Sequence, residues 1–105
     1  TSYHQGIDIA GSTGNAIYTS ASGVVVYAGW SDYGYGLMVV IDHGDGWQTL
    51  YGHMNTVDVV CGQAVFQGNV IGGVGSTGNS TGSHLHFEMQ HDAYGKVNPF
   101  DFVSP

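Results

Sequence analysis

Short apolar runs separated by glycine-rich turns make up most of this chain, and they predict strands rather than helices. Eighteen glycines and no convincing 3.6-residue periodicity argue against helical structure. The runs are rich in Val, Ile and Tyr and are bounded by turn signals, which is typical of strands. The expected strands are Gly6–Ala10, Ala16–Tyr18, Gly23–Trp30, Leu37–Asp42, Trp47–Tyr51, Val57–Val60, Val70–Val74 and His84–Gln90.

These runs indicate an all-β fold, a mostly antiparallel β-sandwich with long loops walling a groove. Gly44-Asp45-Gly46 is a hairpin turn signal between two of the strands. A faint internal repeat relates Gly23–Val25 to Gly68–Ile71, and such hairpins resemble those of lipoyl and biotinyl carrier domains. Carriers need a modifiable lysine at a hairpin tip, whereas Lys96 lies near the C-terminus, so carrier function is disfavoured.

Length and charge narrow the function classes. The 105 residues suit one domain, which we assign to residues 1–105. One basic residue stands against eight acidic ones, so no basic patch can form and nucleic-acid binding is excluded. No apolar run approaches the roughly 20 residues that cross a bilayer, so no membrane span is expected in this segment. Cys61 is the single cysteine, which rules out an internal disulfide, and we expect it to be semi-buried.

Strand alternation places three ionisable side chains on one face of the last long run. Residues i and i+2 of a strand point to the same side, about 7 Å apart. His84, His86 and Glu88 therefore share a face, while Leu85 and Phe87 take the core face. Glu88 either orients an imidazole N–H or is an exposed strand residue, and the sequence leaves both interpretations open.

Two further stretches supply candidate metal ligands. His4 and Asp8 lie near the start of the chain, and His53 follows a predicted strand. Taken alone, they are explained as a surface histidine, a turn aspartate and a structural histidine. Asp8, however, stands within an apolar stretch, where burying an unpaired carboxylate is costly and a metal would remove that cost. Imidazole and carboxylate together are a ligand set that suits Zn²⁺.

Other enzyme classes lack their motifs. The chain has no His-Glu-x-x-His helix motif and no Gly-x-Ser-x-Gly elbow. The Gly75–Gly82 loop is not followed by Gly-Lys-Ser/Thr, so it is no phosphate cradle of the Walker type. Three aromatic residues before Gly36 either wall a groove or simply pack: Trp30, Tyr33 and Tyr35.

The motifs together resemble the M23 family of zinc metallopeptidases, of the LytM and lysostaphin type. The resemblance rests on His-x-x-x-Asp at residues 4–8, Tyr-x-His at 51–53 and the block Gly75–Glu88, and it runs from Gly6 to about Phe102. It implies a zinc-dependent endopeptidase that hydrolyses peptide bonds of bacterial peptidoglycan, in cross-links, stem peptides or Gly-Gly bridges.

The resemblance also implies residue roles. His4, Asp8 and His86 would bind one Zn²⁺ per chain, and His53 and His84 would be catalytic. Three protein ligands leave a position for a water whose pKa falls to about 7 on the metal. One imidazole would take its proton, and the other would stabilise the oxyanion or protonate the leaving amine; the sequence does not assign which does which.

Two alternatives belong to other classes. A non-catalytic M23-like wall-binding or activator domain would have the same fold, but degenerate members typically lose some of the five residues that are intact here. A metal-binding structural protein would explain His4, Asp8 and His86 but not His53 and His84.

The resemblance bears on domain organisation and location as well. A ligand already stands at position 4 and the usual preceding strand is missing, so we expect a fragment of a longer chain that lacks its N-terminal strand. The expected location is extracytoplasmic: secreted, periplasmic or wall-associated, or virion-associated in a phage lysin. At some positions, including Leu37 and Ser83, this chain differs from the residue that family members often have. None of these differences removes a candidate metal ligand or catalytic residue.

Overall fold

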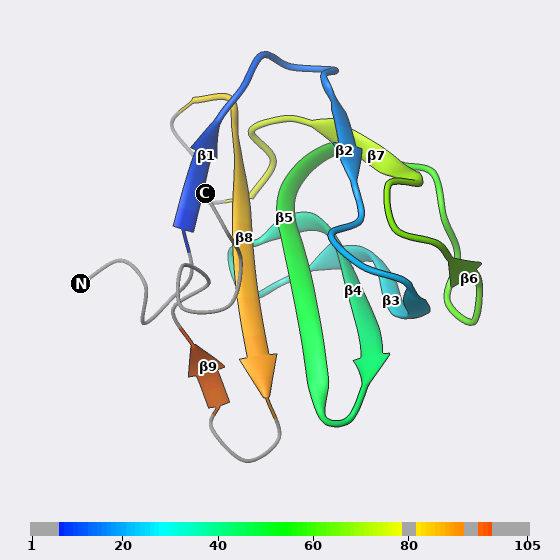
Figure 1. The fold of residues 1–105 in the computed structure, drawn as a ribbon. Helices are drawn as coiled ribbons and strands as arrows, with labels where there is room; N and C mark the ends of the chain where they lie inside the picture. Colours follow the sequence, from blue (N-terminus) through cyan, green and yellow to red (C-terminus); the bar gives the residue numbers. More distant parts are fainter. Residues whose placement is uncertain (1–6, 79–81, 92–94, 98–105) are drawn as a thin grey trace.

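Nine strands and no helix form the described part of the chain, which covers residues 7–78, 82–91 and 95–97 of a computed structural model (Figure 1). The predicted all-β, mostly antiparallel fold is therefore confirmed. The strands are β1 (Ile7–Ala10), β2 (Ala16–Tyr18), β3 (Gly23–Ser31), β4 (Gly36–Gly44), β5 (Trp47–Val57), β6 (Ala64–Val65), β7 (Val70–Val74), β8 (His84–His91) and β9 (Gly95–Val97).

All pairs among the described strands are antiparallel and belong to one hydrogen-bonded sheet. The main path runs β1-β8-β5-β4-β3-β6, while β9 pairs with β8, and β7 pairs with both β5 and β2. The path places β8, which carries the His-x-His pair, between β1 near the start of the chain and β5 in its middle. Segments far apart in sequence are therefore adjacent at β8 (Figure 1).

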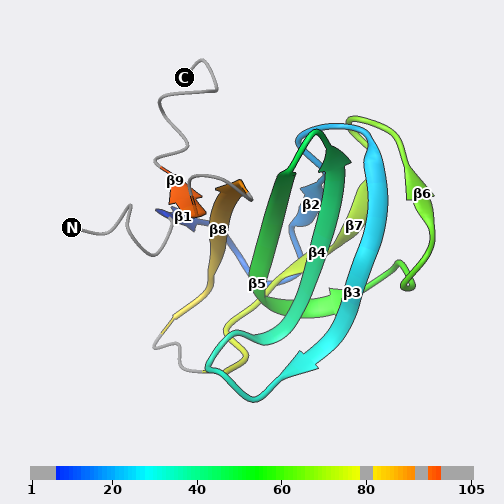
Figure 2. The ribbon, with the colours of Figure 1, turned by 90° about the horizontal axis from the view of Figure 1, so that it is seen from below.

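The long strand β5 joins two layers because it bends at His53. Residues up to Gly52 pair with β8, and residues from Met54 pair with β7. Between them His53 has φ of 58°, a left-handed conformation that is uncommon for a residue with a side chain. The bend carries β7 and β2 behind the β3–β4–β5 part of the sheet (Figure 2).

The core fills the space between these layers. It draws on side chains of β2 to β8. Tyr51 is one of its largest fully buried side chains, and its hydroxyl accepts a hydrogen bond from Thr49 Oγ1, 2.9 Å away. The buried apolar side chains are Ile17, Val25, Val39, Ile41, Leu50, Tyr51, Met54, Val59, Val65, Ile71, Val74 and Phe87.

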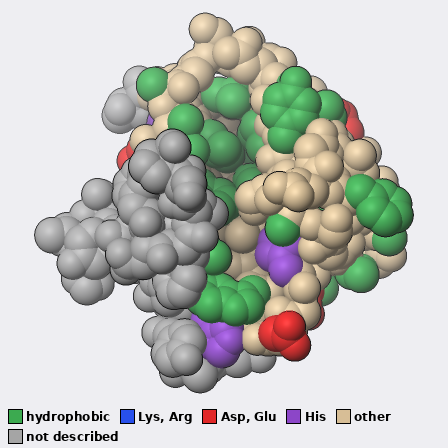
Figure 3. All heavy atoms as spheres, viewed as in Figure 1, with side chains coloured by type: hydrophobic (Ala, Val, Ile, Leu, Met, Phe, Trp, Pro, Cys, Tyr) green, Lys and Arg blue, Asp and Glu red, His purple; other side chains and the backbone are tan. Residues whose placement is uncertain are grey.

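A groove of about 270 Å³ opens between β1, β2, β7 and β8. Figure 3 shows hydrophobic side chains inside a hollow of this face. Leu85 lines the groove, so it lies on the side of β8 opposite to His84 and His86. The groove is therefore separate from the histidine face.

Several strand predictions need correction. Val57–Val60 is not a separate strand, because β5 continues through the predicted break and ends at Val57. The short strands β6 and β9 were not predicted. Cys61, expected to be semi-buried, is exposed, and its Sγ lies 3.4 Å from the carbonyl oxygen of Val26. In the described ranges, no helix is long and apolar enough to cross a membrane.

Candidate active site

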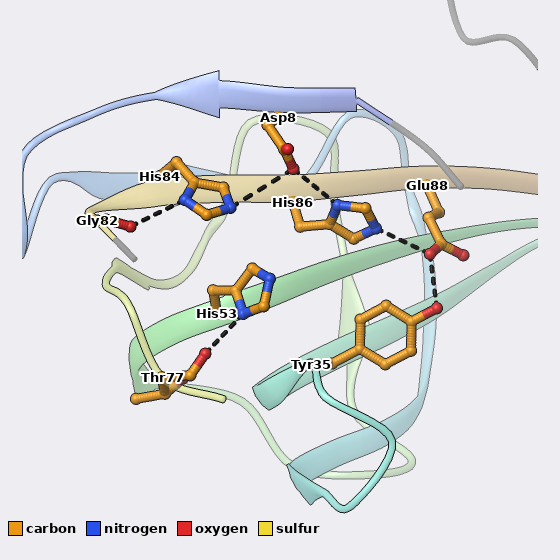
Figure 4. Close-up of polar contacts among 8 residues, drawn as sticks. All are labelled: Asp8, Tyr35, His53, Thr77, Gly82, His84, His86 and Glu88. Carbon is orange, nitrogen blue, oxygen red and sulfur yellow. Dashed lines mark hydrogen bonds and ion pairs between the residues drawn. The ribbon is translucent and has the colours of Figure 1, made fainter. Parts of the chain in front are cut away.

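Strand register brings Asp8, His84 and His86 together. Asp8 pairs with His86 across β1 and β8, and Ala10 pairs with His84 one step along. On the other side of β8, Gly52 of β5 pairs with His86. The predicted shared face of His84 and His86 is confirmed, and Figure 4 shows both rings directed towards Asp8.

The carboxylate of Asp8 touches both imidazoles through one oxygen. Its Oδ1 lies 2.8 Å from His86 Nδ1 and 3.5 Å from His84 Nε2. The side chains of His84 and His86 are 22% and 15% exposed, whereas that of Asp8 is 63% exposed. The cluster is thus open to solvent on the Asp8 side and closed on the side of the sheet.

His53 enters from β5 and completes a group of three imidazoles. Its ring centroid lies 4.9 Å from that of His84 and 5.8 Å from that of His86. The bend at His53 is held by its backbone N–H, which donates to the carbonyl oxygen of Tyr35 at 2.7 Å. The left-handed backbone at this position therefore directs the ring towards β8.

Backbone carbonyls fix the tautomers of His53 and His84. His53 Nδ1 lies 2.6 Å from the carbonyl oxygen of Thr77, and His84 Nδ1 lies 2.9 Å from that of Gly82. Because a carbonyl oxygen only accepts, both Nδ1 atoms carry a proton. The basic atom of each neutral ring is then Nε2, the atom that His84 directs at Asp8.

His86 has the opposite arrangement. Its Nε2 lies 2.9 Å from Oε2 of Glu88, and its Nδ1 faces Asp8. When the proton of the neutral ring is on Nε2, where it donates to Glu88, the Nδ1 lone pair faces the oxygen of Asp8. Two acceptors at this distance need a proton or a metal cation between them. The donor set therefore fits a cation at Asp8 and His86.

The surroundings shift the pKa values of two histidines in opposite directions. The hydrogen bond to Glu88 raises the pKa of His86, and Asp8 adds to this against the effect of burial. Burial lowers the pKa of His53, and the neighbouring His84 and His86 add to that effect. His53 is therefore poised to be neutral where His86, without a cation, is protonated.

The third expected metal ligand, His4, lies outside the described residues. Within residues 7–78, 82–91 and 95–97, no group of three or more His, Cys, Asp and Glu side chains is arranged as a metal cluster. Asp8 and His86 are thus two of three expected ligands, with His53 and His84 beside them.

Sequence reasoning missed two residues that shape the site. Thr77 holds His53 through its carbonyl oxygen, and its Oγ1 donates to the carbonyl oxygen of Met54 at 2.7 Å. Tyr35, considered only as a groove wall or packing residue, donates its hydroxyl to Glu88 Oε2 at 2.6 Å. Glu88 itself is buried, so the exposed alternative for it is wrong.

Solved structures with this fold include peptidases. The catalytic domain of the antimicrobial peptidase lysostaphin from Staphylococcus simulans superposes with a TM-score of 0.91 at 34% identity, over 97% of this chain and 80% of that one. A zinc-containing peptidase from Vibrio cholerae gives a TM-score of 0.88 at 33% identity, over 97% of this chain and 31% of that one.

Curated relatives that are equally similar to this chain are named for different functions, one as an activator and one as a peptidase. The murein hydrolase activator NlpD of Escherichia coli is 43% identical over 100 residues, which are 95% of this chain and 26% of NlpD. The DD-carboxypeptidase/endopeptidase Mpg of Neisseria meningitidis is 43% identical over 102 residues, 97% of this chain and 23% of Mpg. The chain thus spans about a quarter of the length of these relatives. The model of peptidase family M23 matches residues 2–99, and the chain belongs to this family.

Proposed function

We propose that this domain is a zinc-dependent endopeptidase that hydrolyses peptide bonds of bacterial peptidoglycan. The observation that carries the proposal is the pairing of His86 Nδ1 with Asp8 Oδ1 at 2.8 Å, beside two further imidazoles. Similarity to a zinc-containing peptidase supports the choice of metal. The wall-related names of the curated relatives support the substrate and an extracytoplasmic location.

The ligands in this proposal are His4, Asp8 and His86, and one Zn²⁺ binds per chain. Bound zinc would supply an activated water and would polarise the scissile carbonyl. Asp8 contributes the negative charge of the ligand set, and His86 contributes the Nδ1 lone pair that its bond to Glu88 leaves available.

The catalytic residues in this proposal are His53 and His84. In each ring the Nδ1–H donates to a backbone carbonyl oxygen, so Nε2 is the atom available for proton transfer. One Nε2 accepts the proton of the attacking water, and the other, once protonated, donates to the oxyanion or the leaving amine. The fixed tautomers restrict both steps to a single atom of each ring.

A murein hydrolase activator is the second candidate, and the 43% identity to NlpD favours it. An activator would bind the wall or another hydrolase without cleaving peptides. The two functions differ in one measurable property, because only the peptidase generates new amine ends when the purified protein is incubated alone with the wall.

The test is incubation of purified, zinc-loaded protein with purified sacculi. The peptidase should release soluble muropeptides with new amine ends and no new reducing sugar ends, since water attacks a carbonyl and not a glycoside. His53→Ala is the matched control, because it removes one catalytic imidazole and leaves the three proposed ligands. No release by wild-type protein, or release that persists undiminished in His53→Ala, would reject the proposal.

A further inference from the structure

Glu88 is a buried carboxylate that is neither a proposed metal ligand nor a proposed catalytic residue. Glu88 is 0% exposed, and the protein has only one Lys or Arg side chain that could neutralise a buried carboxylate. Removing a carboxylate from water is costly unless donors surround it. Donors among the described residues include His86 Nε2 at 2.9 Å and the Tyr35 hydroxyl at 2.6 Å on Oε2, and Gln90 Nε2 at 2.9 Å on Oε1.

The bond to Glu88 favours the tautomer of His86 whose lone pair is on Nδ1, the nitrogen that faces Asp8. With the proton held on Nε2, the lone pair is on Nδ1, opposite Asp8 Oδ1. Without this acceptor, the proton is free to move to Nδ1, where it donates to Asp8 and occupies the metal-binding atom. An acceptor on the far side of a ligating imidazole also fixes the orientation of the ring.

Tyr35 fixes the same oxygen from the other side. It comes from the loop between β3 and β4, 53 residues from Glu88, and its ring centroid lies 5.6 Å from that of His86 (Figure 4). Gly52 makes room for this ring, because a Cβ at that position would lie 3.3 Å from Tyr35 Cδ1 and 3.6 Å from His86 Cβ. The backbone carbonyl of Tyr35 also accepts from His53 N–H.

We propose that Glu88 is the positioning residue for the metal ligand His86, and that Tyr35 is the positioning residue for Glu88. Both act through the direction and tautomer of one imidazole. The inference rests on the proposed zinc site, and it adds two residues that determine how tightly this site holds its metal.

The first measurement is zinc affinity by competition with a chelator. Glu88→Gln keeps the size of the side chain but loses the charge, and zinc should bind about 100-fold more weakly, at the upper end for groups that hold a ligand in place. Tyr35→Phe removes one hydroxyl and should weaken binding about tenfold. Tyr33→Phe is the matched control, because Tyr33 is 92% exposed, and its affinity should equal that of wild type.

The second measurement is nitrogen-15 NMR of the histidine side chains in the zinc-loaded protein. Wild type and Tyr33→Phe should show a slowly exchanging His86 Nε2–H, as expected for a buried donor to a carboxylate. In Glu88→Gln this proton should shift and exchange faster. If Glu88→Gln does not fold, as judged by circular dichroism, Tyr35→Phe carries the test, because it leaves the buried carboxylate in place.

The inference is overturned if Glu88→Gln or Tyr35→Phe folds with wild-type zinc affinity and an unchanged His86 Nε2–H signal. A loss of thermal stability alone, with both readouts unchanged, means a structural role and overturns it equally. The outcomes are separable from those of the proposed function. If the variants bind zinc more weakly but the wild type never cleaves sacculi, the inference is supported and the peptidase is rejected. If the wild type cleaves sacculi but the variants keep wild-type zinc affinity and an unchanged His86 Nε2–H signal, the peptidase is supported and the inference is rejected.

Discussion

At the scale of single residues, the five polar side chains fall into two classes. Replacing His4, Asp8 or His86 by Ala removes a proposed ligand, so zinc occupancy and hydrolysis should fall together. Replacing His53 or His84 by Ala should leave zinc bound while turnover drops about 10²–10⁴-fold, the typical contribution of acid–base groups. Elemental analysis with an assay on sacculi checks both.

The comparison of His84→Ala with His86→Ala is the most informative part of that series. Both residues lie on one face of β8 and both approach Asp8, so a general folding defect would affect them alike. Zinc lost from His84→Ala but retained by His86→Ala would reverse the assigned roles. Zinc retained by both would place the metal elsewhere.

The raised pKa of His86 predicts a pH dependence of stability in the metal-free protein. A histidine whose pKa is higher in the folded state than the unfolded value of about 6.5 binds more protons when folded. Its stabilising contribution is complete below about pH 6.5 and is lost as pH rises through the folded-state pKa. Urea unfolding of the metal-free protein should therefore show this loss as the pH rises above about 6.5.

A variant isolates that contribution, because the other histidines titrate as well. The lowered pKa of His53 acts in the opposite sense, since its contribution is lost as pH falls. The difference between wild type and His86→Ala removes the part of the His53 effect that burial causes, which is the largest part. A difference in unfolding free energy that grows with rising pH, instead of shrinking, would contradict the assignment.

At the scale of elements, the loop after β7 is packed against the loop before β4. A Cβ on Gly78 would lie 2.4 Å from both Gly34 O and Gly36 N, and its φ of 74° already disfavours a side chain. Gly78→Ala should therefore displace this loop together with Thr77, whose carbonyl oxygen holds His53. We expect lower stability and lower turnover, measured by urea unfolding and the sacculus assay.

Gly62→Ala is a control that measures the loss of unfolding free energy caused by the backbone conformation alone, without a steric contact. Gly62 has φ of 93°, and a Cβ added there would meet no atom within 4 Å, so Ala should cost only the left-handed conformation, about 1–2 kcal/mol. Gly78→Ala should exceed that value. Equal losses in the two variants would mean that the contact between the loops does not support the site.

The bounds of several strands could be predicted from the sequence pattern, but those of β5 could not. Alternation and turn residues predicted β2 and β7 with their observed bounds, and placed His84, His86 and Glu88 on one face. They divided β5, because Gly52 and His53 interrupt the apolar pattern as a loop would. The strand continues because burial against β7 and β8 outweighs the local cost of a left-handed histidine.

The parts of the site that the sequence left open depend on contacts between distant residues. The pairs Tyr35–Glu88 and His53–Thr77 are 53 and 24 residues apart, and no local pattern marks either of them. Alternation predicted the face of Glu88 but not its burial, which accompanies its pairing with Leu50 of β5 and its hydrogen bond to Tyr35. The roles of His4 and of the two catalytic histidines stay predictions from family resemblance.

At the scale of the whole molecule, zinc should contribute to stability. A ligand that binds only the folded state stabilises it by about 2.7 kcal/mol at a free concentration 100-fold above Kd. For a domain of this size, removal of zinc should lower Tm by about 10–20 °C. Differential scanning calorimetry with and without a chelator measures the shift, and Asp8→Ala should show none. An unchanged Tm in wild type would contradict a site made from these residues.

The pairing of β1 with β8 joins Asp8 to His86 across 78 residues of sequence. A cation bound there would be a reversible cross-link between residues 78 positions apart, in a protein whose single cysteine cannot form an internal disulfide. Hydrogen exchange of the β1 amides should then report metal supply directly, slow with zinc and fast without it. In the proposed extracytoplasmic location, scarcity of zinc would loosen β1 first, and proteases would cleave the metal-free protein sooner than the zinc-loaded protein.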